Sequence, residues 1–261
     1  MTQAAPRRTR QPGHTVRTEP SERWVRGYVD GTLLFDTHAA LLLFETGHTP
    51  VYYVPEADVR IELLSPTEHS SYCPYKGDAS YWSINAPSGV RENAVWAYPE
   101  PLDAEAPDLR GYVAFYWRHV DAWFEEDEQI YVHPRDPYKR VDALPSSRHV
   151  VVRVNGETLA ETHRPVVLFE TGLPTRYYIP RLDVRQDVLR ASEKRTACPY
   201  KGEAGYFSVE AGGKEARDIA WHYDHPLAAC DAIAGHIAFF NERVELVVDG
   251  VTQEQPVTKW S

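Results

Sequence analysis

The sequence predicts a mainly β protein, built from two tandem copies of a small domain with about one short helix in each copy. Three observations support this fold class. Blocks of sequence recur at a fixed offset of 125 residues, which indicates an internal duplication. Each copy places an Asp-Gly or Asn-Gly pair, the preferred two-residue hairpin turn, after its first apolar run. Aromatic and β-branched residues, which are typical of strands, dominate the runs between turns.

The duplication is visible in five blocks that recur in the same order. The pairs are Phe44–Gly47 with Phe169–Gly172, Tyr52–Tyr53 with Tyr177–Tyr178, Asp58–Arg60 with Asp183–Arg185, Cys73–Gly77 with Cys198–Gly202, and Trp96–Tyr98 with Trp221–Tyr223. The match then shifts by one residue, because Gly111 corresponds to Gly235. A single deletion between Tyr98 and Gly111 explains the shift.

The repeat divides the chain into four segments. Residues 1–21 are polar and contain three prolines, and we expect them to form a disordered tail. The first repeat domain is predicted over residues 22–125 and the second over residues 148–256. Residues 126–147 between them combine prolines with many charges, and we interpret them as a linker.

The elements of each copy follow in order. The first hairpin turns at Asp30-Gly31, and its counterpart turns at Asn155-Gly156, so different residues make the same turn. A short helix is expected near Asp58, after Pro55 ends a strand, with Asp58 as its cap. In the first copy the other predicted strands are Leu41–Phe44, Val51–Val54, Tyr81–Ile84, Val95–Tyr98 and Tyr112–Tyr116.

Composition limits the classes of partner. The formal net charge of −10 argues against a nucleic-acid surface, since phosphate binding needs a basic footprint. No stretch approaches the roughly 20 apolar residues of a membrane helix, and the arginines near the start precede no apolar run, so we expect neither a membrane segment nor a secretory signal. With only three cysteines, a cytoplasmic protein with reduced thiols is expected. The oligomeric state is left open.

The Cys73–Gly77 block resembles a known family. Together with Trp96–Pro101 and Gly111–Tyr116, and with the second occurrence at Cys198–Gly202, it is similar to the family named domain of unknown function 427. The resemblance covers nearly all of both copies. It implies a small, β-tent-like domain of the kind found in methionine sulfoxide reductases, and a nucleotidyltransferase-like label. Zinc-binding β-tent proteins carry paired Cys-x-x-Cys knuckles, which this chain lacks.

The cysteine and lysine of this block are the first candidates for chemistry. Lys76 and Lys201 follow Cys73 and Cys198 by three residues, and a nearby cation could favour a reactive thiolate. Alternatively, each cysteine packs as a small apolar side chain. Lys76 and Lys201 could instead hold a carboxylate or phosphate in a turn rich in backbone N–H groups.

Glu45 and Glu170 end apolar runs, so each could be a partly buried acid or base. Each could equally pair with the arginine of the next block, Arg60 or Arg185. These arginines could also clamp an anionic ligand, since guanidinium binds carboxylate or phosphate in a bidentate way.

The aromatic residues that recur could form a wall for a planar or cationic ligand. Tyr81 and Tyr98 correspond to Tyr206 and Tyr223. Alternatively these rings, with Trp96 and Trp221, form the core of a small β domain.

No metal or cofactor is expected. His222 and His225 would point to opposite faces of a strand, and the sequence contains no glycine-rich phosphate loop or nucleophile elbow. We therefore expect each domain to bind a small anionic or aromatic metabolite through Glu45, Arg60, Cys73, Lys76 and Tyr81, or their second-copy counterparts. The alternatives are an enzyme that uses Cys73 or Cys198, with glutamate and lysine as acid–base groups, and a structural module that binds a protein partner.

Overall fold

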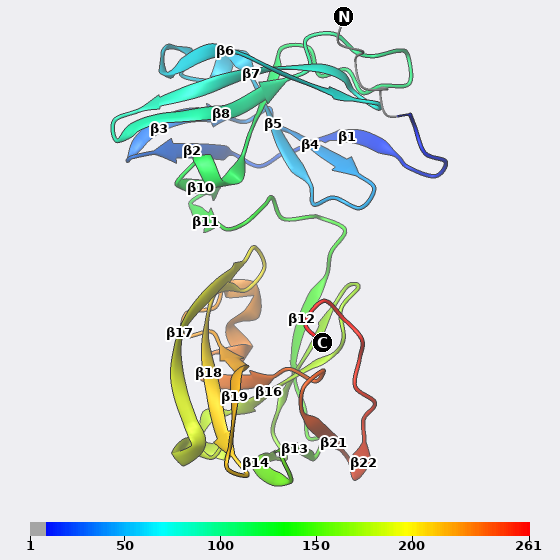
Figure 1. Cartoon of the computed structure of the whole chain (residues 1–261), viewed down its shortest axis with the longest axis vertical. Coiled ribbons are helices and arrows are strands. Elements are labelled where there is room, and N and C mark those ends of the chain that lie inside the picture. Colours follow the sequence, from blue (N-terminus) through cyan, green and yellow to red (C-terminus); the bar gives the residue numbers. More distant parts are fainter. Residues whose placement is uncertain (1–8) are drawn as a thin grey trace, which may run out of the picture. The chain divides into compact units, whose positions relative to one another are not determined.

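The computed structural model describes residues 9–261, which divide into two compact units with their boundary between Asp136 and Pro137. Each unit contains one seven-stranded and one four-stranded sheet, and all the pairings between strands are antiparallel (Figure 1). The predicted fold class, mainly β with two repeated halves, is therefore confirmed. Within the described residues no helix is both long and apolar enough to cross a membrane.

The first unit begins and ends with a short edge strand. Its strands are β1 (Val16–Pro20), β2 (Val25–Val29), β3 (Thr32–Thr37), β4 (Leu41–Glu45), β5 (Val51–Pro55), β6 (Leu64–Cys73), β7 (Gly77–Ala86), β8 (Gly89–Ala97), β9 (Tyr112–Phe115), β10 (Ala122–Glu125) and β11 (Glu128–Ile130). Its 3-10 turns are η1 (Glu56–Asp58), η2 (Ile61–Leu63) and η3 (Trp117–His119). The large sheet has the order β1-β4-β5-β9-β8-β7-β6, and the small sheet has the order β11-β10-β2-β3.

The second unit repeats this topology. Its strands are β12 (Val141–Pro145), β13 (Val150–Val154), β14 (Glu157–Thr162), β15 (Val166–Glu170), β16 (Arg176–Pro180), β17 (Leu189–Cys198), β18 (Gly202–Ala211), β19 (Lys214–His222), β20 (His236–Phe239), β21 (Glu245–Val248) and β22 (Val251–Thr252). Its 3-10 turns are η4 (Arg181–Asp183), η5 (Gln186–Val188) and η6 (Ala228–Ile233). The sheet orders are β12-β15-β16-β20-β19-β18-β17 and β14-β13-β21-β22.

Each large sheet has an apolar cluster on both faces. Because successive side chains of a strand point to opposite faces, Tyr52 and Val54 of β5 join the core shared with the small sheet, whereas Tyr53 faces the other way. The core between the sheets includes Phe35 from the small sheet and Phe115 from the large sheet, whose rings lie 4.9 Å apart. The opposite face of the large sheet is where aromatic residues gather around Tyr53 and Tyr81.

Strands occur in segments for which the sequence predicted none. β1 lies in the expected disordered tail and pairs with β4, and its counterpart β12 lies in the expected linker and pairs with β15. β11, also in the linker segment, pairs with β10. β1 and β12 are edge strands, which need a partner on one side only and tolerate polar, proline-containing sequence. The repeat does indicate these two strands, because Val16 and Pro20 of β1 recur as Val141 and Pro145 of β12.

The short helix predicted near Asp58 is replaced by two 3-10 turns, η1 and η2, and the second unit has the equivalent η4 and η5. Asp58 does not cap them. It accepts a hydrogen bond from Thr37 Oγ1 at 2.6 Å, just as Asp183 accepts one from Thr162 Oγ1 at 2.7 Å. The aspartate thus joins the first turn to the small sheet.

The outer strands of the large sheets, β6 and β17, are ten residues long and mostly exposed. Their pairing with the neighbouring strand is interrupted. The register shifts between Pro66 and Ser70 in β6, and between Ala191 and Arg195 in β17. Both edges are therefore bent away from a continuous ladder.

A hydrogen bond between aromatic side chains is present in both units. Trp96 Nε1 donates to Tyr53 Oη at 3.1 Å, and Trp221 Nε1 donates to Tyr178 Oη at 3.0 Å.

The hydrogen bond of the second unit can be tested by Tyr178→Phe. This change leaves the buried indole N–H of Trp221 without its acceptor, which costs about 1–3 kcal/mol. We expect urea unfolding to show one shifted transition, that of the second unit. Tyr177→Phe is the control, because that hydroxyl makes only a 3.4 Å contact with Arg148. An equal shift in both variants would contradict the assignment.

Candidate functional site

The first unit contains a cavity of about 200 Å³ on the face of its large sheet that the small sheet does not cover. Strands β4, β5, β7 and β8 position most of its lining. The lining residues are Leu43, Glu45, His48, Val51, Tyr53, Lys76, Tyr81, Trp96, Tyr98 and Tyr116. The wall is therefore mainly aromatic, with one carboxylate, one ammonium and one imidazole.

An ion pair between Glu45 and Lys76 forms the charged part of the cavity. Glu45 is the last residue of β4, and Lys76 lies in the turn between β6 and β7. Lys76 Nζ donates to Glu45 Oε2, and both side chains are largely buried. Glu45 Oε1 also lies 3.1 Å from Nε2 of His14. Burial alone would raise the pKa of Glu45, but the hydrogen bond and charge of Lys76, with the contact to His14, outweigh it and lower the pKa.

The tyrosines of the cavity are held in place by contacts at their hydroxyl groups or rings. Tyr81 Oη lies 2.7 Å from Ser71 Oγ, and Tyr53 Oη accepts from Trp96. Lys76 Nζ lies 5.8 Å from the centre of the Tyr98 ring. Burial raises the pKa of Tyr53 and Tyr98, so both hydroxyls stay neutral at neutral pH and can donate hydrogen bonds.

The second unit repeats the charged pair and the tyrosines. Lys201 Nζ donates to Glu170 Oε2 at 2.5 Å, and Tyr206 Oη lies 2.8 Å from Thr196 Oγ1. Burial alone would lower the pKa of Lys201, but the nearby Cys198 and Glu170 outweigh it and raise the pKa. Burial likewise raises the pKa of Tyr223.

The second unit differs where Val51 lines the cavity of the first. The corresponding residue is Arg176, the first residue of β16, and its side chain is buried. Arg176 donates two hydrogen bonds of 2.7 Å to Glu242, and its guanidinium lies 5.6 Å from the Trp221 ring and 5.9 Å from the Phe240 ring. Trp221 and Phe240 are the counterparts of the cavity residues Trp96 and Tyr116.

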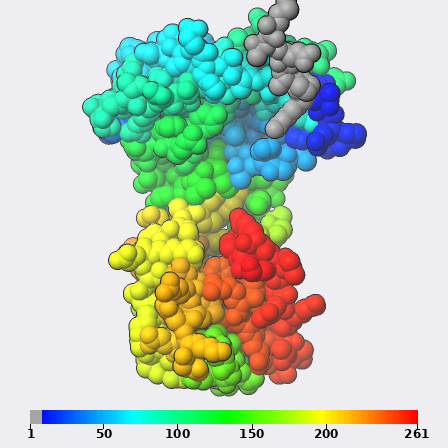
Figure 2. Space-filling model, in the orientation of Figure 1, coloured from blue at the N-terminus to red at the C-terminus, as the bar shows by residue number. Residues whose placement is uncertain are grey.

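The end of the chain completes this arrangement in the second unit. Thr258 Oγ1 donates to Glu242 Oε1 at 2.7 Å, and the Trp260 ring lies 5.6 Å from the Arg176 guanidinium. Figure 2 shows this last segment, in red, on the surface of the second unit. In the second unit, a buried arginine paired with a carboxylate thus stands where Val51 lines the first unit's cavity, and three aromatic rings lie near its guanidinium.

The structure brings together some of the residues predicted from sequence. Glu45, Lys76, Tyr81 and Tyr98 line one cavity. Their counterparts Tyr206 and Tyr223 lie in one apolar cluster of the second unit.

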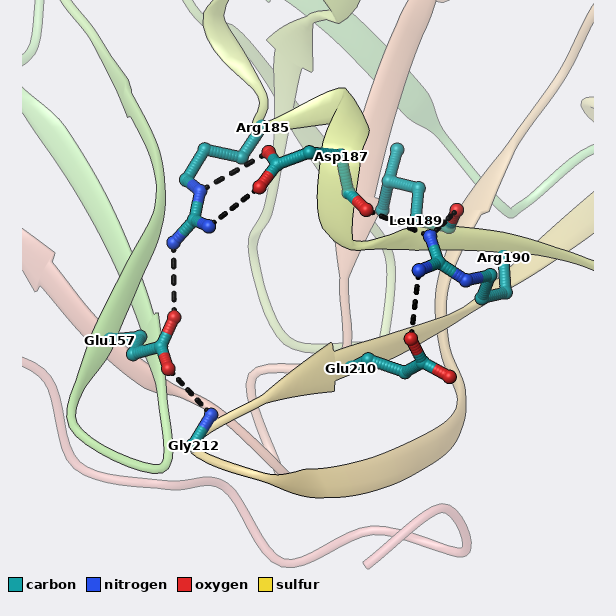
Figure 3. A network of polar contacts seen from close by, with 7 residues as sticks. All are labelled: Glu157, Arg185, Asp187, Leu189, Arg190, Glu210 and Gly212. Atoms are coloured by element: carbon teal, nitrogen blue, oxygen red, sulfur yellow. Dashed lines mark hydrogen bonds and ion pairs between the residues drawn. The ribbon is translucent and has the colours of Figure 1, made fainter.

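Arg60 and Arg185 lie elsewhere. Arg60 is an exposed residue that pairs with Glu62. Arg185 forms ion pairs with Asp187 at 2.7 Å and with Glu157 at 3.0 Å (Figure 3). Figure 3 shows this network joining η5 to the hairpin loops that carry Glu157 and Gly212. These ion pairs, with the hydrogen bond from the Gly212 amide to Glu157, hold the loops together.

The cysteines lie beside the cluster of aromatic residues and do not line the cavity. Cys73 and Cys198 are half-buried, and neither sulfur makes a hydrogen bond to another described residue. Cys230 is buried, and burial raises the pKa of its thiol to about 11. His222 pairs with Asp224 at 2.9 Å, and among residues 9–261 no three His, Cys, Asp or Glu side chains form a group suited to a metal ion.

Sequence reasoning missed the residues that distinguish the two units. Val51 and Arg176 occupy the first position of the otherwise similar strands Val51–Pro55 and Arg176–Pro180. Arg118 and Glu242 occupy corresponding positions two residues after Tyr116 and Phe240. Mismatches between otherwise similar segments of the two copies mark both positions, whereas residues that recur in both copies do not reveal them.

A model of the family described as domain of unknown function 427 (NTP_transf_9) matches the chain twice, at residues 17–126 and 142–250. The two matches include all the strands of both large sheets except the first residue of β1 and of β12. No curated protein matches the chain.

The Arg176–Glu242 pair predicts a pH dependence of stability. Burial would raise the pKa of Glu242, but the hydrogen bonds from Arg176 and Thr258 outweigh it and lower the pKa from 4.5 to about 2. The contribution of a carboxylate with a lowered pKa is present above pH 4.5 and is lost as the pH falls toward 2. The Glu242→Gln variant lacks this carboxylate at every pH. It should therefore be less stable than the original protein by about 3 kcal/mol at pH 7. The difference in stability should shrink below pH 4.5, where the original protein loses the contribution of Glu242.

The measurement is the urea midpoint of the second unit's transition, the one shifted by Tyr178→Phe, between pH 7 and pH 3. Glu245→Gln removes the exposed ion pair with Arg153 and should change stability by less than about 1 kcal/mol. A difference between Glu242→Gln and the original protein that stays constant over this pH range would rule out the assigned ion pair.

Proposed function

Since the chain belongs to the family described as domain of unknown function 427, we propose its function from the site itself: the first domain binds a small anionic or aromatic metabolite. The observation that carries the proposal is the cavity lined by aromatic rings around the Glu45–Lys76 pair. Ligand sites in proteins are typically concave and mostly apolar, with a few polar groups that orient the ligand. The cavity has this composition.

The volume of the cavity favours a small ligand. At roughly 30 Å³ per water molecule, about 200 Å³ equals the volume of roughly seven waters, which suits a compact small molecule. Sites for drug-sized ligands measure about 300–1,000 Å³. The proposed ligand is therefore a single ring with one substituent, which is much smaller than a nucleotide.

The side chains offer both stacking and polar contacts to such a molecule. Trp96 and Tyr116, whose ring centres lie 4.6 Å apart, both line the cavity and offer aromatic surface to a ligand. Lys76 carries three N–H donors, of which Glu45 takes one. An anionic or hydrogen-bonding substituent could therefore share Lys76 with Glu45, while the ring lies among the aromatic side chains.

The proposal predicts that small ring compounds bind in the cavity and that a larger side chain at Val51 blocks their binding. We expect at least one of benzoate, benzamide and benzamidine to bind saturably in ligand-observed NMR by saturation transfer. Val51→Phe places a ring in the cavity and should abolish that signal. Val90→Phe is the matched control, since Val90 is exposed and does not line the cavity. Absence of binding by all three probes, or binding that survives Val51→Phe, would refute the proposal.

A further inference from the structure

The two domains hold opposite charges at one position beside the site. In the second domain the residue two positions after Phe240 is Glu242, and in the first domain the residue two positions after Tyr116 is Arg118. The local turns are the same, because the amide of His119 donates to Tyr116 O at 2.9 Å and that of Arg243 to Phe240 O at 2.8 Å. The side chains therefore leave equivalent backbone positions.

In the second domain this position serves an internal ion pair. Arg176 extends from β16 to Glu242 with two hydrogen bonds of 2.7 Å, and both residues are buried. The flat guanidinium lies within 6 Å of the Trp221 and Phe240 ring centres, an arrangement that a planar cation favours. The charges around the site balance, because Lys201 has Glu170 and Arg176 has Glu242.

In the first domain the corresponding charges do not balance. Lys76 is paired with Glu45. Arg118 is exposed, donates from Nε to His119 Nε2 at 3.2 Å, and forms no ion pair with any residue in the described part of the chain. Its guanidinium lies 5.0 Å from the centre of the Tyr116 ring, a residue of the cavity wall. Val51 stands where the second domain has Arg176, so the first domain has no cationic side chain at this position of β5.

We propose that the ligand of the first domain is an aromatic acid whose ring takes the position held by the Arg176 side chain in the second domain, and whose anionic group pairs with Arg118. The second domain is closed to such a ligand by its own Arg176–Glu242 pair. The inference rests on the proposed function. It adds that the ligand is anionic, that Arg118 binds its charged group, and that only the first domain binds it. Guanidinium binds carboxylate in a bidentate way, which suits a benzoate-sized acid.

The test compares benzoate with benzamide, which has nearly the same shape and no charge. On the full chain we expect benzoate to bind at least about tenfold more tightly than benzamide, and Arg118→Gln to remove this preference while benzamide binding changes little. Arg110→Gln is the control, because Arg110 is an exposed arginine paired with Asp108 and outside the site. Equal affinities in the original protein, or a benzoate preference that survives Arg118→Gln, would overturn the inference and leave the proposed function standing. Failure of every probe would refute both.

An exchange of residues between the domains tests the choice of domain. Val51→Arg with Arg118→Glu recreates the internal pair in the first domain and should abolish benzoate binding. Arg176→Val with Glu242→Arg, added to that variant, should restore benzoate binding, now in the second domain, with NMR contacts to Trp221. If the second exchange unfolds the second domain, the first exchange and the Arg118→Gln variant still test the inference. Benzoate binding that survives the first exchange would overturn the inference.

Discussion

Each domain depends on one lysine–glutamate ion pair that joins distant parts of the large sheet. Glu45 ends β4 and Lys76 lies in the turn between β6 and β7, and three strands separate β4 from β7 in the sheet order. The two charges are largely removed from water, which is costly unless each has its partner. Removing either side chain leaves the other as a buried, unpaired charge. Both copies accordingly keep the glutamate of the Phe-Glu-Thr-Gly block together with the lysine of the Cys-Pro-Tyr-Lys-Gly block.

How much of the structure could be predicted depended on whether local sequence carried the signal. The duplication, the hairpin turns at Asp30 and Asn155 and the central strands were predicted because turn chemistry and repeated apolar runs are local properties. β1 was missed because an edge strand is specified by its neighbour β4 more than by its own polar residues. Arg60 was placed in the site because it recurs in both copies, yet its contact is with Glu62, two residues away. The recurrence of a residue in both copies therefore does not distinguish a residue of an internal ion pair from one that lines the cavity.

The two domains keep the same backbone but differ in what closes the aromatic face of the large sheet. In the first, the face holds a cavity beside Val51. In the second, Arg176 and Trp260 lie over the same wall, and the η6 residues Cys230 and Ile233 belong to the cluster. A buried pair such as Arg176–Glu242 contributes little net stability compared with apolar packing of similar volume. Its presence therefore marks a difference between the two aromatic faces, because the second domain has a buried arginine where the first has Val51 beside the cavity.

The bent outer strands have a consequence for the behaviour of the protein at high concentration. An outer strand of ten residues exposes backbone donors and acceptors that a second chain could use to extend the sheet. The register shifts in β6 and β17 interrupt that row, and exposed Glu193, Lys194 and Arg195 place charges along it. Edge-to-edge aggregation would have to bury these charges and straighten the strand. Irregular pairing at the rim of each large sheet thus opposes fibril-like assembly.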